Sequence, residues 1–167
     1  VDRLSEAFQY YLLRASCDIA KEKGKCEGFE RTKYAEGLLP IDHYKKEIDE
    51  IVPHKQRMAW ESLRKDIAKY GLRHSTLSAQ MPSESSSVVS NETNGIEPPR
   101  AMLQIKKSKK GPLKQIAPGF PKLKNDYTLL WDMPSNEGYI NVVAMMQKYF
   151  DCLLYTSPSP RDIGQSR

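Results

Sequence analysis

The first part of the chain repeats hydrophobic and polar positions with the period of an amphipathic helix. Between residues 4 and 23, apolar side chains recur at spacings that place them on one helical face. This face consists of Leu4, Phe8, Tyr11, Leu12, Ala15 and Ile19. Gly24 follows and is typical of a helix end. We therefore expect a long helix whose apolar face packs inward.

Two further helices are predicted before residue 72. Residues 41–52 have a short, charged helical pattern that ends at Pro53. Residues 57–70 have a clearer amphipathic pattern, which ends at Gly71. The positions expected to face inward on this second helix are Trp60, Leu63, Ile67 and Tyr70.

Beyond residue 72 the pattern becomes mixed. Residues 75–79 are typical of a short strand, and residues 84–90 of a short helix. Residues 100–107 and 113–117 are predicted strands, which turn-forming residues join as a hairpin. Residues 121–131 and 136–150 return to helical spacing, and Asn136 is a candidate cap for the last helix. Helices interspersed with strands predict an α/β fold.

Composition narrows the class of protein. The chain has 167 residues, enough for one domain with a core. We find no targeting segment and no apolar run of membrane-spanning length, so we expect a cytoplasmic protein. Three cysteines are too few for a disulfide framework. Cys17 lies beside the apolar face of a helix and is predicted to be a small buried hydrophobe, whereas Cys26 lies in a loop.

The net charge of +5 is modest, and only residues 106–110 (KKSKK) form a dense basic run. This run fits a solvated hairpin tip, with attraction to nucleic acid as the alternative.

The last residues do not continue the pattern. Residues 152–162 (CLLYTSPSPRD) interrupt an amphipathic helix after Asp151 and read as a translated sequencing adapter. We therefore treat residues 152–167 as a non-native tail and residues 1–151 as the part of the chain that belongs to one domain.

A candidate anion site follows the predicted strand at residues 75–79. It consists of Pro82, Ser83, Glu84, Ser85 and Ser86, which we call the phosphate turn. The first turn of a helix has about four N–H groups without intrahelical partners, and its dipole favours an anion. Serine hydroxyls add donors without bulk, so a diphosphate is the ligand that this turn suits best. Glu84 is then a helix-start carboxylate or a contact for a sugar hydroxyl or base edge.

The alternative for this turn is an ordinary helix cap, in which the Ser83 side chain accepts a hydrogen bond from the Ser86 amide. A second candidate segment is residues 94–100 (NGIEPPR). Its Asn-Gly pair favours positive φ, and its two prolines stiffen the entry to the next strand. This segment is either a loop that lines the same opening as the phosphate turn or only a rigid connector.

Four segments together carry a resemblance to a known family. They are RLSEAFQYYLLRAS, YAEGLLPIDHYKKEID, GLRHSTLSAQMPSESSSVVSNETNGIEPPR and GYINVVAMMQKYF. In order and without large gaps, residues 1–151 resemble the large catalytic (alpha) subunit of class I, aerobic ribonucleoside-diphosphate reductase, near its C-terminal end. The block 71–100 is the most specific part of this resemblance.

The resemblance implies a ten-stranded α/β barrel, incomplete in this chain, with the active site inside. It also implies an oxidoreductase of deoxyribonucleotide synthesis. In such enzymes a thiyl radical abstracts the 3′-hydrogen of a ribonucleoside diphosphate, and two further cysteines reduce the 2′-position. The implied cofactors and effectors are a di-iron tyrosyl-radical centre in a separate small subunit, and ATP and deoxynucleotides at regulatory sites. The implied partners are that small subunit, thioredoxin or glutaredoxin, and a second large subunit.

Residue by residue, the resemblance carries over only the substrate diphosphate site, onto the phosphate turn. Ser85 stands where many relatives have Thr, which keeps the hydroxyl. The radical cysteine, the reducing cysteines, the radical-path tyrosines and the regulatory sites all match segments outside this chain, so we expect no catalytic residue, no held cofactor and no activity in it alone. Tyr10 and Tyr11 lack the context of the radical-path pair and are interpreted as one core and one rim residue.

Two alternatives stay open at this point. One is a cobalamin-dependent reductase of the same barrel superfamily, which the presence or absence of a tyrosine pair and cysteine tail beyond Asp151 would decide. The other is a non-enzymatic, basic module that binds phosphate or nucleic acid, which salt-dependent DNA binding would support.

Overall fold

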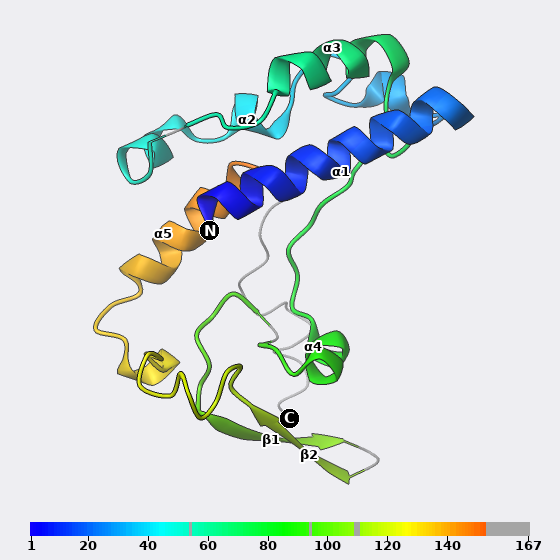
Figure 1. Cartoon of the computed structure of the whole chain (residues 1–167). Coiled ribbons are helices and arrows are strands. Elements are labelled where there is room, and N and C mark those ends of the chain that lie inside the picture. Colours follow the sequence, from blue (N-terminus) through cyan, green and yellow to red (C-terminus); the bar gives the residue numbers. More distant parts are fainter. Residues whose placement is uncertain (54, 94, 109–110, 153–167) are drawn as a thin grey trace, which may run out of the picture. The chain divides into compact units, whose positions relative to one another are not determined.

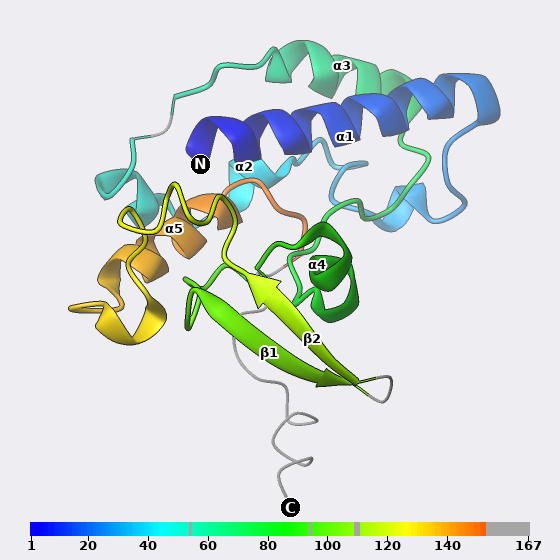
Figure 2. The same cartoon turned by 60° about the horizontal axis from the view of Figure 1, so that its bottom comes forward.

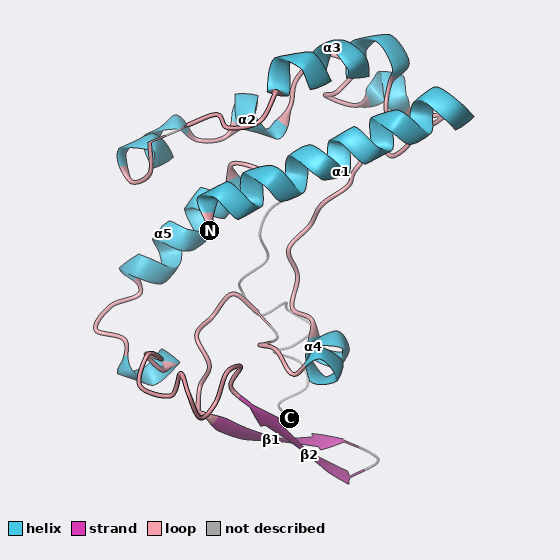
Figure 3. Cartoon of the chain, in the orientation of Figure 1, coloured by secondary structure: helices cyan, strands magenta, loops and turns pink. Residues whose placement is uncertain are grey.

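The computed structural model describes residues 1–152 except 54, 94 and 109–110. The chain forms two compact units, and the division between them falls within the last helix. The first unit contains residues 1–80 and the described residues after 140, and the second contains residues 81–140. Figure 3 shows that helices and loops dominate the described residues, whose strands form a β-hairpin.

The first unit is built on α1 (Asp2–Lys23) and α3 (Trp60–Tyr70). These helices lie side by side in both views (Figures 1 and 2), and an ion pair of 2.7 Å between Arg14 and Asp66 joins them. Both end where the sequence predicts, because Gly24 and Gly71 adopt positive φ and donate their amides to Ala20 and Ile67. The core cluster of this unit consists of Leu13, Cys17, Phe29, Tyr34, Leu39, Ile41, Trp60, Leu63, Ile67, Leu72 and Tyr149.

The predicted inward face of α1 is wrong. Leu4, Phe8 and Tyr11 are exposed, whereas the buried positions are Ser5, Glu6, Gln9, Leu13, Ser16, Cys17 and Ala20. The buried polar side chains hold specific hydrogen bonds, and these fix which side of the helix packs against the core. Tyr10 contacts Trp60 edge to face with ring centroids 5.3 Å apart, while Tyr11 is exposed, so the core-and-rim interpretation is confirmed.

The connection between α1 and α3 differs from the prediction of one helix at 41–52. It contains a 3₁₀ turn (Phe29–Arg31), α2 (Pro40–His43) and a second 3₁₀ helix (Lys46–Glu50). The helix predicted at 41–52 is interrupted at Tyr44, whose backbone is extended and whose hydroxyl donates to the Asp49 carboxylate. Helix α3 also begins three residues later than predicted and leaves Tyr70 exposed at its end.

The predicted strand at residues 75–79 is absent, and only Gln80 forms an isolated bridge. The amides of Leu77 and Ser78 donate instead to the carboxylate of Asp151, over 2.7 and 3.1 Å. A strand needs a neighbouring strand for its ladder of hydrogen bonds, and the described residues place none beside this segment.

The second unit contains α4 (Glu84–Ser90) and the antiparallel strands β1 (Leu103–Ser108) and β2 (Gly111–Ile116). The predicted short helix and hairpin are therefore confirmed. Of the basic run at 106–110, residues 106–108 end β1, whereas residues 109 and 110 and the side chains of the whole run lie outside the described part of the structure. This unit is a partial α/β arrangement with one two-stranded sheet among its described residues.

The predicted helix at residues 121–131 is wrong. The chain there makes successive turns, such as those closed by Leu123 to Gly119 and Asp126 to Leu123, before a 3₁₀ helix (Leu130–Asp132). Residues 119–126 are exposed, so no buried apolar face stabilises a regular helix. The last predicted helix is confirmed as α5 (Glu137–Gln147), with the Asn136 carbonyl accepting from the Ile140 amide.

Candidate functional site

The phosphate turn lies at the start of α4, as the sequence predicts. Ser83 is the residue before the helix, with φ −112° and ψ 67°, and its side chain makes no capping hydrogen bond. Its hydroxyl donates over 3.5 Å to the Met81 carbonyl instead. The ordinary-cap alternative, with Ser83 bound to the Ser86 amide, is therefore not what the structure shows.

The donors of the turn face solvent. Pro82, Ser83, Ser85 and Ser86 are all exposed, and the first backbone bond of the helix runs from the Ser87 amide to the Ser83 carbonyl, over 3.0 Å. The amides of Ser85 and Ser86 precede that bond, so the helix itself offers them no acceptor. The side chain of Glu84 lies outside the described part of the structure.

The other end of α4 is fixed to β2. Asn91 ends the helix in the left-handed region, with φ 55°, and its side-chain oxygen accepts from the Ile116 amide over 3.3 Å. Gln115 donates from its side chain to the carbonyls of Ser87 and Glu92, the first over 3.3 Å. These bonds tie the C-terminal half of the short helix α4 to β2.

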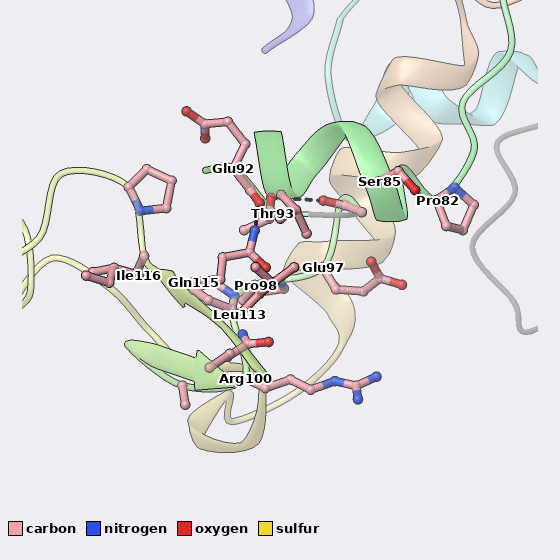
Figure 4. Close-up of a pocket in the computed structure, with 17 residues that line it drawn as sticks. Pro82, Ser85, Glu92, Thr93, Glu97, Pro98, Arg100, Leu113, Gln115 and Ile116 are labelled. Atoms are coloured by element: carbon pink, nitrogen blue, oxygen red, sulfur yellow. Dashed lines mark hydrogen bonds between the residues drawn. The ribbon is translucent and has the colours of Figure 1, made fainter. Parts of the chain in front are cut away.

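A pocket of about 770 Å³ adjoins the turn. Pro82 and Ser85 line one side, and Glu97, Pro98 and Arg100 of the second candidate segment line another (Figure 4). The interpretation of residues 94–100 as a loop that shares an opening with the phosphate turn is thus confirmed. Arg100 is the only basic residue that the described lining contains.

Two details of this loop differ from expectation. Gly95 does not adopt a positive φ, and Asn94 lies outside the described residues. Two hydrogen bonds hold this loop. The Thr93 hydroxyl donates to the Gly95 carbonyl over 3.2 Å, and the Leu130 amide donates to the Pro99 carbonyl over 3.1 Å.

Sequence reasoning missed several residues of the pocket. Glu92, Thr93, Gln104, Leu113 and Gln115 also line it. Leu113 and Gln115 lie two apart on β2, so their common face follows from strand periodicity. That α4 would pack against this face depends on the long-range bonds of Gln115 and Asn91, which no local pattern indicates.

The described residues contain no group of three or more His, Cys, Asp or Glu side chains arranged to hold a metal ion. Of the described helices, none is long and apolar enough to cross a membrane. Cys17 is fully buried, as predicted, and burial raises the pKa of its thiol. Cys26 is partly buried and packs against the core cluster.

Comparison with known proteins decides the family. The sequence model of the family described as "Ribonucleotide reductase, barrel domain" matches residues 1–129. The chain belongs to this family. The phosphate turn and its adjoining pocket both fall within the matched residues.

Curated relatives agree with the family match. The chain is 57% identical over 149 residues to the ribonucleoside-diphosphate reductase subunit alpha of Haemophilus influenzae, covering 89% of this chain and 20% of that protein. It is 55% identical over 146 residues to reductase 1 subunit alpha of Escherichia coli, covering 87% and 19%. It is 45% identical over 148 residues to the subunit alpha of phage T4, covering 87% and 20%. The chain thus spans about a fifth of these relatives' length.

Proposed function

We propose that this chain is the substrate-diphosphate-binding part of a ribonucleoside-diphosphate reductase alpha subunit. The whole protein then converts ribonucleoside diphosphates to 2′-deoxyribonucleoside diphosphates by a thiyl-radical mechanism on a ten-stranded α/β barrel. The observation that carries the proposal is the identity of 55–58% to proteins with that name across most of this chain. Residues 1–151 are the proposed native part, and residues 152–167 the non-native tail.

Within this proposal the phosphate turn has a positioning role. Its exposed hydroxyls and the first-turn amides, to which the helix itself offers no acceptor, suit the charged oxygens of a diphosphate. Holding the diphosphate fixes the ribose relative to reacting groups that other segments supply, and correct orientation lowers reaction barriers. Arg100, on the same pocket, is a further candidate contact for a negative charge or a base edge.

The proposed partners and cofactors belong to the whole protein. They are a ribonucleoside diphosphate, a small subunit with a di-iron tyrosyl-radical centre, thioredoxin or glutaredoxin as reductant, a second alpha subunit, and ATP and deoxynucleotides as effectors. The printed names of the relatives, which contain "subunit alpha", support a partner subunit.

The test uses a full-length chimera, in which this chain replaces the aligned segment of the Haemophilus influenzae subunit. We expect Ser83→Ala and Ser86→Ala each to raise the KM for a ribonucleoside diphosphate roughly tenfold or more, because a hydrogen bond to a charged group contributes about 1.5–3 kcal/mol. Turnover should change little, since uniform binding is lost. Steady-state assays with the small subunit and a thiol reductant measure both quantities.

Ser90→Ala is the matched control, because Ser90 lies on the same helix and its hydroxyl donates to the Ser86 carbonyl over 3.0 Å. Its KM should stay near that of the parent chimera. A large fall in turnover with unchanged KM in the Ser83 and Ser86 variants would contradict a purely positioning role, in which these hydroxyls only hold the diphosphate. Activity that needs a cobalamin cofactor in place of the small subunit would favour the cobalamin-dependent alternative.

A further inference from the structure

Helix α4 is too short to be stable by itself. It has seven residues, Glu84–Ser90, whereas isolated helices shorter than about 12–15 residues are marginal in water. The Ser83 side chain makes no capping hydrogen bond that would stabilise the start of the helix. The position of the phosphate turn therefore depends on what α4 contacts in the rest of the second unit.

The outer edge of β2 provides the first contact. The Ala117 amide, just beyond the strand, donates to the Met102 carbonyl over 2.8 Å. Since the amides of successive strand residues point to opposite sides, the Ile116 amide faces away from β1. The Asn91 side chain, directly after α4, accepts from that amide over 3.3 Å. The C-terminal end of α4 thus covers part of the strand edge that β1 leaves open.

Gln115 provides the second contact. Its side-chain amide donates to the Ser87 carbonyl over 3.3 Å and also to the Glu92 carbonyl. The Glu92 amide donates to the same Ser87 carbonyl over 2.9 Å. One side chain of β2 therefore binds both the middle of the helix and the residue that follows its cap.

Ser87 connects this contact to the phosphate turn. Ser87 is buried and directly follows Ser86. Its amide donates to the Ser83 carbonyl over 3.0 Å, and this bond closes the turn that contains Ser85 and Ser86. The amide of Ser87 is thus bound to the turn, and its carbonyl is bound to Gln115. A displacement of Ser87 would move the first-turn amides with it.

The two anchoring side chains differ in their access to the pocket. Gln115 lines the pocket from β2, and Pro82 and Ser85 line it from the phosphate turn (Figure 4). Asn91 is not among the described residues that line the pocket. A direct contact with a ligand is therefore open to Gln115 alone, whereas an effect through α4 is common to Gln115 and Asn91.

We propose that Gln115 and Asn91 are positioning residues for the substrate diphosphate, because they tie α4 to β2 and so keep the phosphate turn ordered before the substrate binds. This inference rests on the proposed function, in which the diphosphate binds at this turn. Loss of either anchor lowers the fraction of molecules with an ordered turn, and the apparent affinity falls in proportion to that fraction. The reacting groups belong to other segments, so turnover of bound substrate is preserved.

Steady-state kinetics of the full-length chimera give the first test. We expect Gln115→Ala and Asn91→Gly each to raise the KM for a ribonucleoside diphosphate roughly three- to tenfold, the effect of losing ordinary hydrogen bonds. Turnover should stay within about twofold of the parent chimera. Lys114→Ala is the matched control, since Lys114 is exposed on the same strand and its side chain points to the opposite face from Gln115.

A conservative variant at residue 91 separates loss of the side-chain acceptor from backbone strain. Residue 91 has a φ of 55°, which glycine adopts readily, so Asn91→Gly removes the acceptor without straining the backbone. Asn91→Asp keeps an acceptor for the Ile116 amide and should return KM to near the parent value. A KM in Asn91→Asp as high as in Asn91→Gly would contradict the role of this hydrogen bond.

Hydrogen exchange of the same chimeras, read by mass spectrometry, distinguishes positioning from direct contact. Without ligand, the amides of residues 85–91 should exchange roughly threefold or more faster in Gln115→Ala and Asn91→Gly than in the parent. In the parent, a ribonucleoside diphosphate should slow the exchange of these amides, because the coupling between the two ends of α4 is reciprocal. Unchanged exchange in Gln115→Ala together with a raised KM would indicate direct contact and overturn the positioning role.

The serine variants separate failure of this inference from failure of the proposed function. If Ser83→Ala raises KM but Gln115→Ala and Asn91→Gly leave it unchanged, the diphosphate binds at the turn and the anchors do not position it, which overturns the inference alone. If all three variants keep the KM of the parent, the diphosphate does not depend on this turn, and both the inference and the proposed site are wrong.

Discussion

Asp151 illustrates how one side chain joins segments that are distant in the sequence. Its carboxylate accepts from the Gln9 side chain over 3.2 Å, from the Tyr34 hydroxyl, and from the amides of Leu77 and Ser78. Burial, and then the Asp151 charge, raises the pKa of Tyr34 well above its usual range. One carboxylate thus holds the segment for which the sequence predicts a strand, and the described residues offer that segment no strand partner.

We expect Asp151→Ala to destabilise the segment around residue 77. Two amides lose their acceptor, and an unsatisfied buried amide costs about 1–3 kcal/mol. Hydrogen exchange of the chimera, followed by mass spectrometry, should show faster exchange in the peptide that contains Leu77 and Ser78. Asp18→Ala is the control, since its pairs with Arg14 and Lys21 are on the surface and contribute about 0–1 kcal/mol. Unchanged exchange near residue 77 would contradict this role of Asp151.

Single residues also decide how far the candidate site was predictable. Pro82 and the serines that follow it predict a helix start with spare hydrogen-bond donors, because this feature depends only on residues close in the sequence. Arg100 belongs to residues 94–100, for which the sequence offers the interpretation of a loop that lines the same opening as the phosphate turn. Gln115 was not predicted, since its bonds to Ser87 and Glu92 join residues more than twenty positions apart.

Among the elements, α3 shows why predicted boundaries shift. The pattern predicts a helix from residue 57, but Arg57 and Met58 donate their amides to Glu6 of α1, over 2.7 and 3.1 Å. These bonds tie residues 57 and 58 to α1 in a non-helical stretch, and α3 begins only at Trp60. Ala59, the residue before α3, makes no side-chain capping bond, so the start of the helix depends on this contact with α1 and not on a local cap.

This junction predicts an acid-sensitive contact between α1 and α3. Burial alone raises the pKa of Glu6, but hydrogen bonds from Arg57, Trp60 and Met58 outweigh it and lower the pKa below 4.5. A lowered pKa means that the stabilisation is complete above about pH 4.5 and is lost as the pH falls through the folded-state value. Burial also raises the pKa values of Asp2 and Asp42, and hydrogen bonds again outweigh it and lower them. The stabilisation that these two carboxylates provide is therefore also lost as the pH falls.

We expect Glu6→Gln to lower the melting temperature at pH 7, because a neutral amide is a weaker acceptor for Arg57 and presents N–H groups to other donors. The free energy of unfolding should fall by about 1–3 kcal/mol. The difference from the parent should shrink as the pH falls below about 4.5. Thermal melts of both chimeras across this range measure it, with the exposed Glu36→Gln as control. A difference independent of pH would exclude Glu6 ionisation as the cause.

At the scale of the whole molecule, both units leave apolar side chains exposed to solvent. The first unit has a core, yet its longest helix exposes an apolar stripe, and the hairpin of the second unit exposes Leu103, Ile105 and Leu113. Exposed apolar faces and open sheet edges favour aggregation. We therefore expect the chain by itself to be poorly soluble.

We also expect the chain by itself to form no deoxyribonucleotide, whereas the chimera with the small subunit does. The physical reason is that a site which orients a diphosphate supplies no reacting group. Chromatography of nucleotides after incubation with a ribonucleoside diphosphate and a thiol reductant distinguishes the two. Turnover by the isolated chain above a no-protein blank would contradict the proposal, and DNA binding that weakens steeply with salt would favour the nucleic-acid alternative.

The sequence alone determined what short-range physics controls: the ends of α1 and α3 at glycines, the start of α4 with its serines, the hairpin, and the family. These depend on backbone freedom and on side chains a few positions apart. Only the tertiary structure decided which face of α1 is buried, where α3 begins, and that Asp151 takes the place of a strand partner. Those outcomes depend on hydrogen bonds between residues that are distant in the sequence, which a local pattern does not report.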